Sequence, residues 1–305
     1  MSGVLIGFAI IAAVIAVGYV LGRTDFLGPD APRVLSRLVF FVLSPCLLFT
    51  VLADADVHVL FSSLLLTSAV AAVITALAFV VIARVLWRRS VPGLVVGGLA
   101  SGYVNANNIG LPVAVYVLGD PAYSAPVILF QLVVLAPVAL TVLDLTTGGT
   151  ASVGRILLQP VRNPLILGSV LGLLVAVTGL SLPDALLEPV RLIGAAAVPV
   201  VLIGFGMSLH GRRVLEAGSD RRDVVLAVLL KLVAMPLVAW GVGVLLGLDS
   251  GQLHAVVVLA ALPSAQNVFN YAQRYRTGEV LARDAVLLST VGAVPVLLVV
   301  SLLLT

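Results

Sequence analysis

The sequence consists mainly of apolar runs of about 20 residues, separated by short polar gaps. An α-helix needs about 20 apolar residues to cross the hydrocarbon core of a bilayer, so most runs can form one span each. Of the 305 residues, 61% are hydrophobic and 10% charged, and the mean hydropathy is +1.22. So few polar side chains cannot cover a water-exposed surface. We therefore predict an all-α integral membrane protein with ten transmembrane helices, at residues 4–22, 33–52, 59–86, 93–118, 124–143, 163–179, 190–209, 223–247, 252–273 and 284–304.

The longest gap, residues 144–162, is rich in threonine and glycine. It predicts a linker between two five-helix halves, residues 1–143 and 163–305. The other gaps leave no room for a soluble domain. The first apolar run lacks the basic flank of a cleavable signal peptide, so we expect it to be a retained helix.

The basic residues orient the chain, because cytoplasmic loops keep Lys and Arg whereas translocated loops lack them. With ten spans, 15 of the 17 basic residues fall at loops on one side. Arg191 lies on the opposite side, and Lys231 lies within the run at 223–247. We expect a cytoplasmic linker and both termini outside the cytoplasm. The arginines then act as topology determinants, and we expect no nucleic-acid partner.

An odd number of helices in each half means that a repeat must be inverted in the membrane. Three pairs of matching features in chain order indicate such a repeat, although any one pair could arise by chance in an apolar chain. We expect kinks at Pro45 and Pro199. The matches are Arg37 and Pro45 with Arg191 and Pro199, the polar sequence at 105–109 with that at 264–268, and Pro137 with Pro295.

Two polar sequences interrupt apolar runs, at residues 105–109 and 264–268. Carboxamides and hydroxyls are costly in hydrocarbon unless they line a cavity or pair with one another. Proline removes a backbone donor and clashes with the preceding turn, so we expect helix breaks at Gly110, Pro112 and Pro263. Crossed broken helices are typical of a transporter's substrate site; the alternative is that the amides only satisfy backbone groups freed by the breaks. The candidate substrate-binding residues are Asn105, Asn107, Asn108, Ser264, Gln266 and Asn267.

Two further polar residues lie inside apolar runs. Gln131, near mid-depth of the run at 124–143, is either a ligand contact or an interhelical hydrogen-bonding group. Lys231 lies about 10 Å inside its run, from the 1.5 Å rise per residue of a helix. Its ammonium could balance a substrate carboxylate, stand in for a coupling cation or snorkel to the cytoplasmic surface.

Half-helix N-termini carry partial positive charge and favour an anion where two broken helices cross. The apolar runs hold no carboxylate at mid-helix that could form a proton relay or a catalytic aspartyl pair, and the three histidines show no metal-ligand spacing. Cys46 is the single cysteine, which excludes a thiolate metal cluster. We expect no enzymatic activity, cofactor or bound metal. Sodium coupling through carbonyls and amides of the broken helices stays open beside uniport driven by the membrane potential.

Both polar regions resemble the two signature regions of the auxin efflux carrier family, which includes plant PIN-FORMED proteins and bacterial carriers named for malate or malonate. The resemblance covers the whole chain. The matching sequences are Asn105-Ala106-Asn107-Asn108-Ile109-Gly110-Leu111-Pro112 with Gly119-Asp120, and Leu262-Pro263-Ser264-Ala265-Gln266-Asn267-Val268 with Ala272-Gln273-Arg274-Tyr275.

This resemblance implies a fold of the bile acid/sodium symporter type. The first, second, sixth and seventh helices would form a scaffold and the interface of a homodimer, while the third to fifth and eighth to tenth would form a mobile transport domain. The chain lacks the large cytosolic loop of the long plant carriers, so auxin does not follow as the substrate.

Together these observations predict a secondary transporter of small organic anions in the bacterial inner (plasma) membrane. We expect efflux of auxin-like or other monocarboxylates or dicarboxylates by an elevator mechanism. The alternatives are a sodium-coupled organic anion symporter of the bile acid type and an ion channel.

Overall fold

The computed structural model describes residues 2–54, 63–147, 163–180, 182–208 and 221–304. These residues are almost entirely helical, and the β-type pairing among them is one isolated bridge. Five apolar helices of 10–17 residues accompany six longer stretches. The prediction of an all-α protein is confirmed, while the count of ten spans stays a prediction. Six stretches are long and apolar enough to cross a membrane: Ala31–Ala53, Ser63–Trp87, Pro121–Thr146, Asp184–Met207, Arg221–Leu245 and Glu279–Leu304.

The chain forms two compact units, each assembled from several separate segments. Unit 1 comprises Met1–Ser62, Asn107–Leu129 and Val161–Arg212, and unit 2 comprises Ser63–Ala106, Phe130–Pro160 and Arg213–Thr305. The expected linker falls largely on residues 148–162, which lie outside the described residues.

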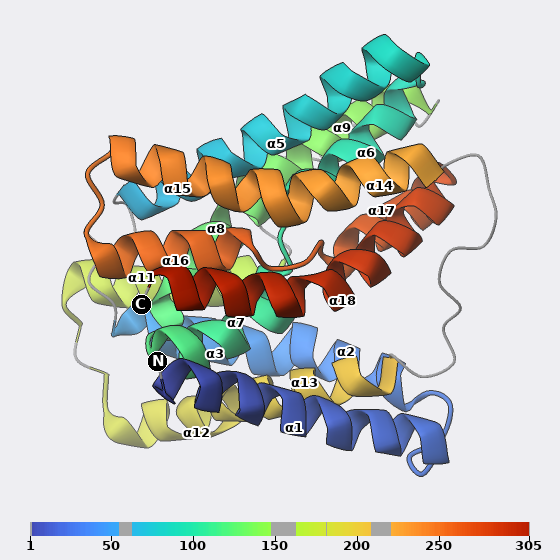
Figure 1. Cartoon of the computed structure of the whole chain (residues 1–305). Coiled ribbons are helices and arrows are strands. Elements are labelled where there is room, and N and C mark those ends of the chain that lie inside the picture. The colour runs from blue at the N-terminus through green and yellow to red at the C-terminus, as the bar shows by residue number, and fades with distance from the viewer. Residues whose placement is uncertain (1, 55–62, 148–162, 181, 209–220, 305) are drawn as a thin grey trace. The chain divides into compact units, whose positions relative to one another are not determined.

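The described residues of unit 1 form eight α-helical segments, coloured blue, green and yellow in Figure 1. Their bounds are α1 (Ser2–Thr24), α2 (Ala31–Leu38), α3 (Ser44–Ala53), α7 (Leu111–Val113), most of α8 (Ser124–Phe130), α11 (Pro164–Thr178), α12 (Asp184–Ala195) and α13 (Ala197–Ser208), with η3 (Ala114–Leu118) and η4 (Pro121–Tyr123) between α7 and α8.

Glycines let helices of unit 1 approach closely. A Cβ atom on Gly18 of α1 would lie 2.2 Å from the Ile203 carbonyl oxygen of α13, and one on Gly206 of α13 would lie 2.1 Å from the Ile15 oxygen. Gly168 of α11 lies similarly against the backbone of Pro45. Small residues at such interfaces allow close backbone packing in membranes, where van der Waals contact drives helix association.

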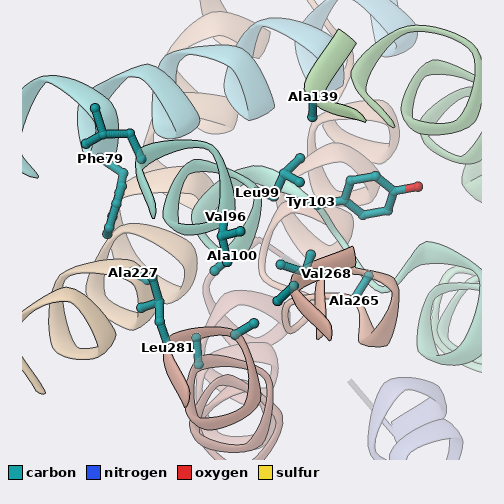
Figure 2. Close-up of a cluster of buried hydrophobic side chains, with 14 of the residues drawn as sticks. Phe79, Val96, Leu99, Ala100, Tyr103, Ala139, Ala227, Ala265, Val268 and Leu281 are labelled. Carbon is teal, nitrogen blue, oxygen red and sulfur yellow. The ribbon is translucent and has the colours of Figure 1, made fainter. Parts of the chain in front are cut away.

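Unit 2 contains the longest helices and a core rich in alanine. Figure 2 shows side chains of this core, including Phe79, Leu99, Ala227 and Leu281. The ring of Phe79 fills the space beside Gly97, where a Cβ atom would clash with it. The helices are α5 (Ser63–Trp87), α6 (Val91–Gly102), α9 (Ala136–Thr146), α14 (Arg221–Leu229), α15 (Met235–Leu245), α16 (Ser250–Ala260), α17 (Gln266–Tyr275) and α18 (Glu279–Leu304).

Four π-helical segments each end two residues before a proline. Proline's ring clashes with the carbonyl four residues earlier, and a π turn relieves this because its hydrogen bonds span five residues. The amide before the proline donates across such a turn in three of the segments. The segments are η1 (Val39–Leu43) before Pro45, η2 (Ala106–Gly110) before Pro112, η5 (Gln131–Leu135) before Pro137 and η7 (Leu230–Ala234) before Pro236.

Because a π turn accommodates Pro112, one expected helix break does not occur at the predicted residues. Pro112 lies inside a continuous helical stretch formed by η2, α7 and η3, and Gly110 has ordinary right-handed helical dihedral angles. The expectation of a break at Gly110 and Pro112 is therefore wrong, because the π turn absorbs the proline. Pro45 follows a π turn in the same way, whereas the helix containing Pro199 is interrupted at Ala196, three residues earlier.

Candidate functional site

Two broken helices of unit 2 meet through their backbones. Helix α6 ends at Gly102 and α16 ends at Ala260, and a non-helical segment joins α16 to α17 (Figure 1). The extended residues Val104 and Ser264 form an antiparallel bridge. We call the joined residues 103–105 and 263–265 the crossover.

Two backbone hydrogen bonds hold the crossover. The Asn105 amide donates to the Pro263 carbonyl at 2.9 Å, and the Ala265 amide donates to the Tyr103 carbonyl at 3.0 Å. Pro263 thus lies in the break. It has no backbone N–H, but its carbonyl can still accept a hydrogen bond. The first break spans residues 103–105 and lies before Asn107 and Asn108, and Tyr103 takes an extended conformation at the end of α6.

Side chains satisfy the remaining backbone groups of the crossover. The Gln131 Oε1 atom accepts a hydrogen bond from the Val104 amide at 2.5 Å, and its Nε2 atom donates to the Val104 carbonyl at 3.0 Å. Ser289 Oγ accepts from the Ser264 amide at 3.0 Å. The oxygen and the nitrogen of the Gln131 carboxamide are therefore both hydrogen-bonded to the backbone, which favours the structural role considered for this residue.

Ser264 makes a further contact through its side chain. Its Oγ atom donates to the Ala100 carbonyl at 2.5 Å, near the C-terminal end of α6. Carbonyls in the last turn of a helix lack intrahelical partners, so Ser264 ties the second break to the end of the first helix. Both Ser264 and Asn105 are buried.

The first turn of α17 presents the other candidate amides of unit 2. Gln266 and Asn267 are partly buried, and the N-cap residue Ala265 supplies no side-chain cap to the turn. The buried hydroxyl of Tyr103 lies beside the Asn267 side chain. The Tyr103 ring packs edge-on against Tyr271, with ring centroids 6.4 Å apart, and Figure 2 shows its hydroxyl extending away from Leu99.

Tyr103 was not a sequence candidate, because an aromatic residue inside an apolar run has the pattern of a core residue. Its position two residues before the polar sequence at 105–109 was the available signal.

The remaining two candidates, Asn107 and Asn108, belong to unit 1. The Asn107 Nδ2 atom donates to Asn108 Oδ1 at 3.0 Å, and both side chains are partly buried. The structure thus places two candidates in unit 1 and the other six, Asn105, Gln131, Lys231, Ser264, Gln266 and Asn267, in unit 2.

The sequence model of the family described as "Membrane transport protein" matches residues 4–148 and 149–301, nearly the whole chain. The chain belongs to this membrane transport protein family. The match confirms the family resemblance found in the two polar regions.

Similar proteins carry names of transporters. The chain is 25% identical over 281 residues to "Uncharacterized transporter YfdV" of Escherichia coli K12, covering 88% of each protein. It is 26% identical over 261 residues to an "Uncharacterized transporter" of Methanothermobacter thermautotrophicus, covering 84% of this chain and 83% of the relative. A third relative, "Putative malonate transporter" of Rhizobium meliloti, is 26% identical over 290 residues, covering 92% and 89%.

The family and the six candidate spans identify a multi-pass membrane transporter with a small-molecule substrate.

Inside unit 2 of this transporter, Lys231 lies in the π turn η7 and is fully buried. Its Nζ atom donates to the Ala260 carbonyl at 2.6 Å and lies 3.1 Å from the Met235 Sδ atom. The ammonium therefore turns into the unit and does not snorkel to a surface.

Two buried carboxylates of the transporter were not recognised as such from the sequence. Asp223 accepts a hydrogen bond from Arg89, and Asp284 Oδ1 accepts one from Arg283 Nε at 2.8 Å. Both aspartates are at most 3% exposed. The signal was an acidic residue within the first two turns of an apolar helix, next to an arginine in sequence.

No group of three His, Cys, Asp or Glu side chains within the described part of the transporter is arranged to hold a metal ion. The described polar groups of the crossover are backbone amides and carbonyls, carboxamides and hydroxyls. The N–H and O–H groups among them can donate hydrogen bonds to a polar solute, and the carbonyl oxygens can accept them.

Proposed function

We propose that this transporter carries small organic anions, monocarboxylates or dicarboxylates, and that the crossover with its neighbouring amides forms part of the substrate site. The observation that carries the proposal is the first turn of α17. Its N-terminus has no side-chain cap, and Asn267 stands in that turn. A helix N-terminus offers backbone donors and partial positive charge to an anion.

The charges elsewhere in unit 2 support an anion over a cation. The buried carboxylates among the described residues, Asp223 and Asp284, are each paired with an arginine. Neither is available to balance a cationic solute. The name of the Rhizobium meliloti relative includes malonate, so malonate is the first dicarboxylate to test.

We also propose an inverted repeat of residues 1–143 and 163–305. Support comes from two side chains with matching roles, because Gln131 and Ser289 each accept a hydrogen bond from the amide of a bridge residue. They are 158 positions apart, the same offset as Pro137 and Pro295. The junction of the two family matches, at residues 148 and 149, falls within the expected linker.

An elevator movement of one helix group against the other completes the proposal. Its support is the division into two compact units, since unit 1 holds most of the proposed scaffold and unit 2 most of the proposed transport domain. Asn107–Leu129 groups with unit 1, so the moving boundary would lie near Ala106. We propose a homodimer formed by the scaffold, in a bacterial plasma membrane, with both termini outside the cytoplasm.

An inside-negative membrane potential would drive such an anion out of the cell. The driving force is about 2.3 kcal/mol per elementary charge for each 100 mV. Efflux by uniport is therefore the proposed direction. Sodium-coupled symport and channel conduction are the competing mechanisms.

The test uses purified protein in liposomes with an imposed potassium-diffusion potential. Labelled malonate, malate and indole-3-acetate should exchange by counterflow, and net flux should follow the potential towards the positive side. Transport that ignores the potential, or competition only by neutral and cationic solutes, would refute the anion proposal. Unitary currents above carrier rates would favour a channel.

Variants then locate the site. Asn108→Ala and Asn267→Ala should each lower transport at least about tenfold, because a lost buried polar contact costs roughly 1–3 kcal/mol. Gln273→Ala removes an exposed amide from the same helix as Asn267 and should leave transport unchanged. Near-normal transport in both asparagine variants at equal reconstitution would exclude these residues.

A further inference from the structure

Lys231 is the single lysine of the chain, and all 16 other basic residues are arginines. It is also 0% exposed, and η7 packs against α5, α6 and α18. Lysine side chains are almost never fully buried unless they are paired. The partner of this ammonium therefore needs an explanation.

No carboxylate among the described residues forms an ion pair with Lys231, and the ammonium instead contacts the Ala260 carbonyl and the Met235 thioether. Ala260 is the last residue of α16. The Val257 and Val258 carbonyls of that turn accept from the Ala261 amide, whereas the Ala260 carbonyl accepts from Lys231. The lysine thus takes the terminal carbonyl of a helix that ends inside the protein.

A helix C-terminus carries about half a negative elementary charge. Inside a membrane protein that charge needs a cation or donors, because water does not reach it. A compact ammonium on a flexible stem can reach such a position, whereas the larger planar guanidinium of arginine suits bidentate partners. The choice of lysine at this one basic position fits that geometry.

We propose that the Lys231 ammonium is the resident cation at the end of the broken helix α16, so that this end of the site takes no sodium ion. The resemblance to sodium symporters implies a coupling cation, and the residues here do not fit one. Hard cations take several oxygen ligands, whereas this position offers one carbonyl oxygen and a soft thioether sulfur. An ammonium has three donors and can use two of them on these two acceptors.

The single lysine makes its charge directly measurable. Protein grown with ¹³C,¹⁵N-lysine has one Nζ group, and its chemical shifts distinguish an ammonium from a neutral amine. We expect an ammonium in the purified protein at neutral pH, unchanged when sodium replaces choline in the buffer. A neutral amine would overturn the proposal.

Thermal unfolding in choline buffer tests the site without any assumption about transport. Sodium should not shift the unfolding temperature of the unmodified protein. Lys231→Ala should lower it, and n-propylammonium should recover part of the loss by occupying the vacated space, whereas n-propanol and tetramethylammonium should not. A stabilisation of the unmodified protein by sodium would overturn the proposal even if the variant failed to fold.

Lys231→Met keeps an unbranched side chain that is one atom shorter, and it removes the charge and the donors. It should also lower the unfolding temperature, and equal stability to the unmodified protein would refute a role for the ammonium. The transport arm rests on the proposed function: anion flux should be equal in sodium and choline. If no anion is transported in either buffer, the proposed function fails while the NMR and unfolding results still decide the role of Lys231.

Discussion

Gln131→Leu separates a structural role of Gln131 from substrate contact. The side chain bonds both the amide and the carbonyl of Val104 within the first helix break. Leucine has similar bulk but leaves these groups without that partner. We therefore expect the variant to be less stable than the unmodified protein but still to bind the ligand.

The two lost bonds are not equivalent. The Val104 amide would lose its partner inside the protein, at a cost of about 1–3 kcal/mol. The Val104 carbonyl also accepts from the Ala106 amide at 2.8 Å, so its loss should cost about 0.5–1.5 kcal/mol. The sum is roughly 2–4 kcal/mol, which should lower the unfolding temperature on the order of 5 °C.

The assay is thermal unfolding of detergent-purified protein, followed by near-ultraviolet circular dichroism with and without a transported anion. Gln273→Leu makes the same substitution at an exposed position of α17 and should change the unfolding temperature little. If Gln131→Leu unfolds at the temperature of the control but no longer gains stability from the anion, Gln131 is a substrate contact and the reasoning is wrong.

Two further predictions concern packing and buried charge. Gly18→Ala should destabilise the protein by about 1–3 kcal/mol, because the new methyl group meets the α13 backbone. The control Gly241→Ala should be neutral or stabilising, because no atom lies within 4 Å of the new methyl group. Equal unfolding temperatures of the two variants would contradict the close contact at Gly18. Arg89→Ala should cost about 2–4 kcal/mol by leaving Asp223 buried and unpaired, less than a fully buried pair because the Arg89 side chain is 34% exposed. Adding Asp223→Asn should recover part of that loss, and a further loss of stability in the double variant would argue against the pairing.

The sequence was informative about the class of protein and about where helices are interrupted, because composition and polar clusters act locally. It misplaced the first break, since Pro112 alone does not report whether a π turn will absorb it. The break occurs at Tyr103 to Asn105 instead, where backbone groups find partners across the crossover. Such partners come from segments about 160 residues away, and no local pattern encodes them.

The candidate site shows the same division. The polar sequences at 105–108 and 264–267 could be found because amides stand out in apolar runs. The hydrogen bonds between Gln131 and Val104 could not be found in this way, because a side chain that binds a backbone group does not require any particular residue type at the partner position. Asp223 and Asp284 were overlooked because charges near helix ends look like loop residues until packing buries them.

The crossover joins two interrupted helices through main-chain hydrogen bonds, and this has an evolutionary consequence. Main-chain donors and acceptors do not change with the side chain, so substitutions at residues 107, 108, 266 and 267 need not break the bonds between Asn105 and Pro263 or between Ala265 and Tyr103. In the proposed substrate site, specificity could then change by single replacements while these main-chain bonds persist. A small piece of β-type pairing in a helical protein would allow related transporters to acquire new substrates without rebuilding their architecture.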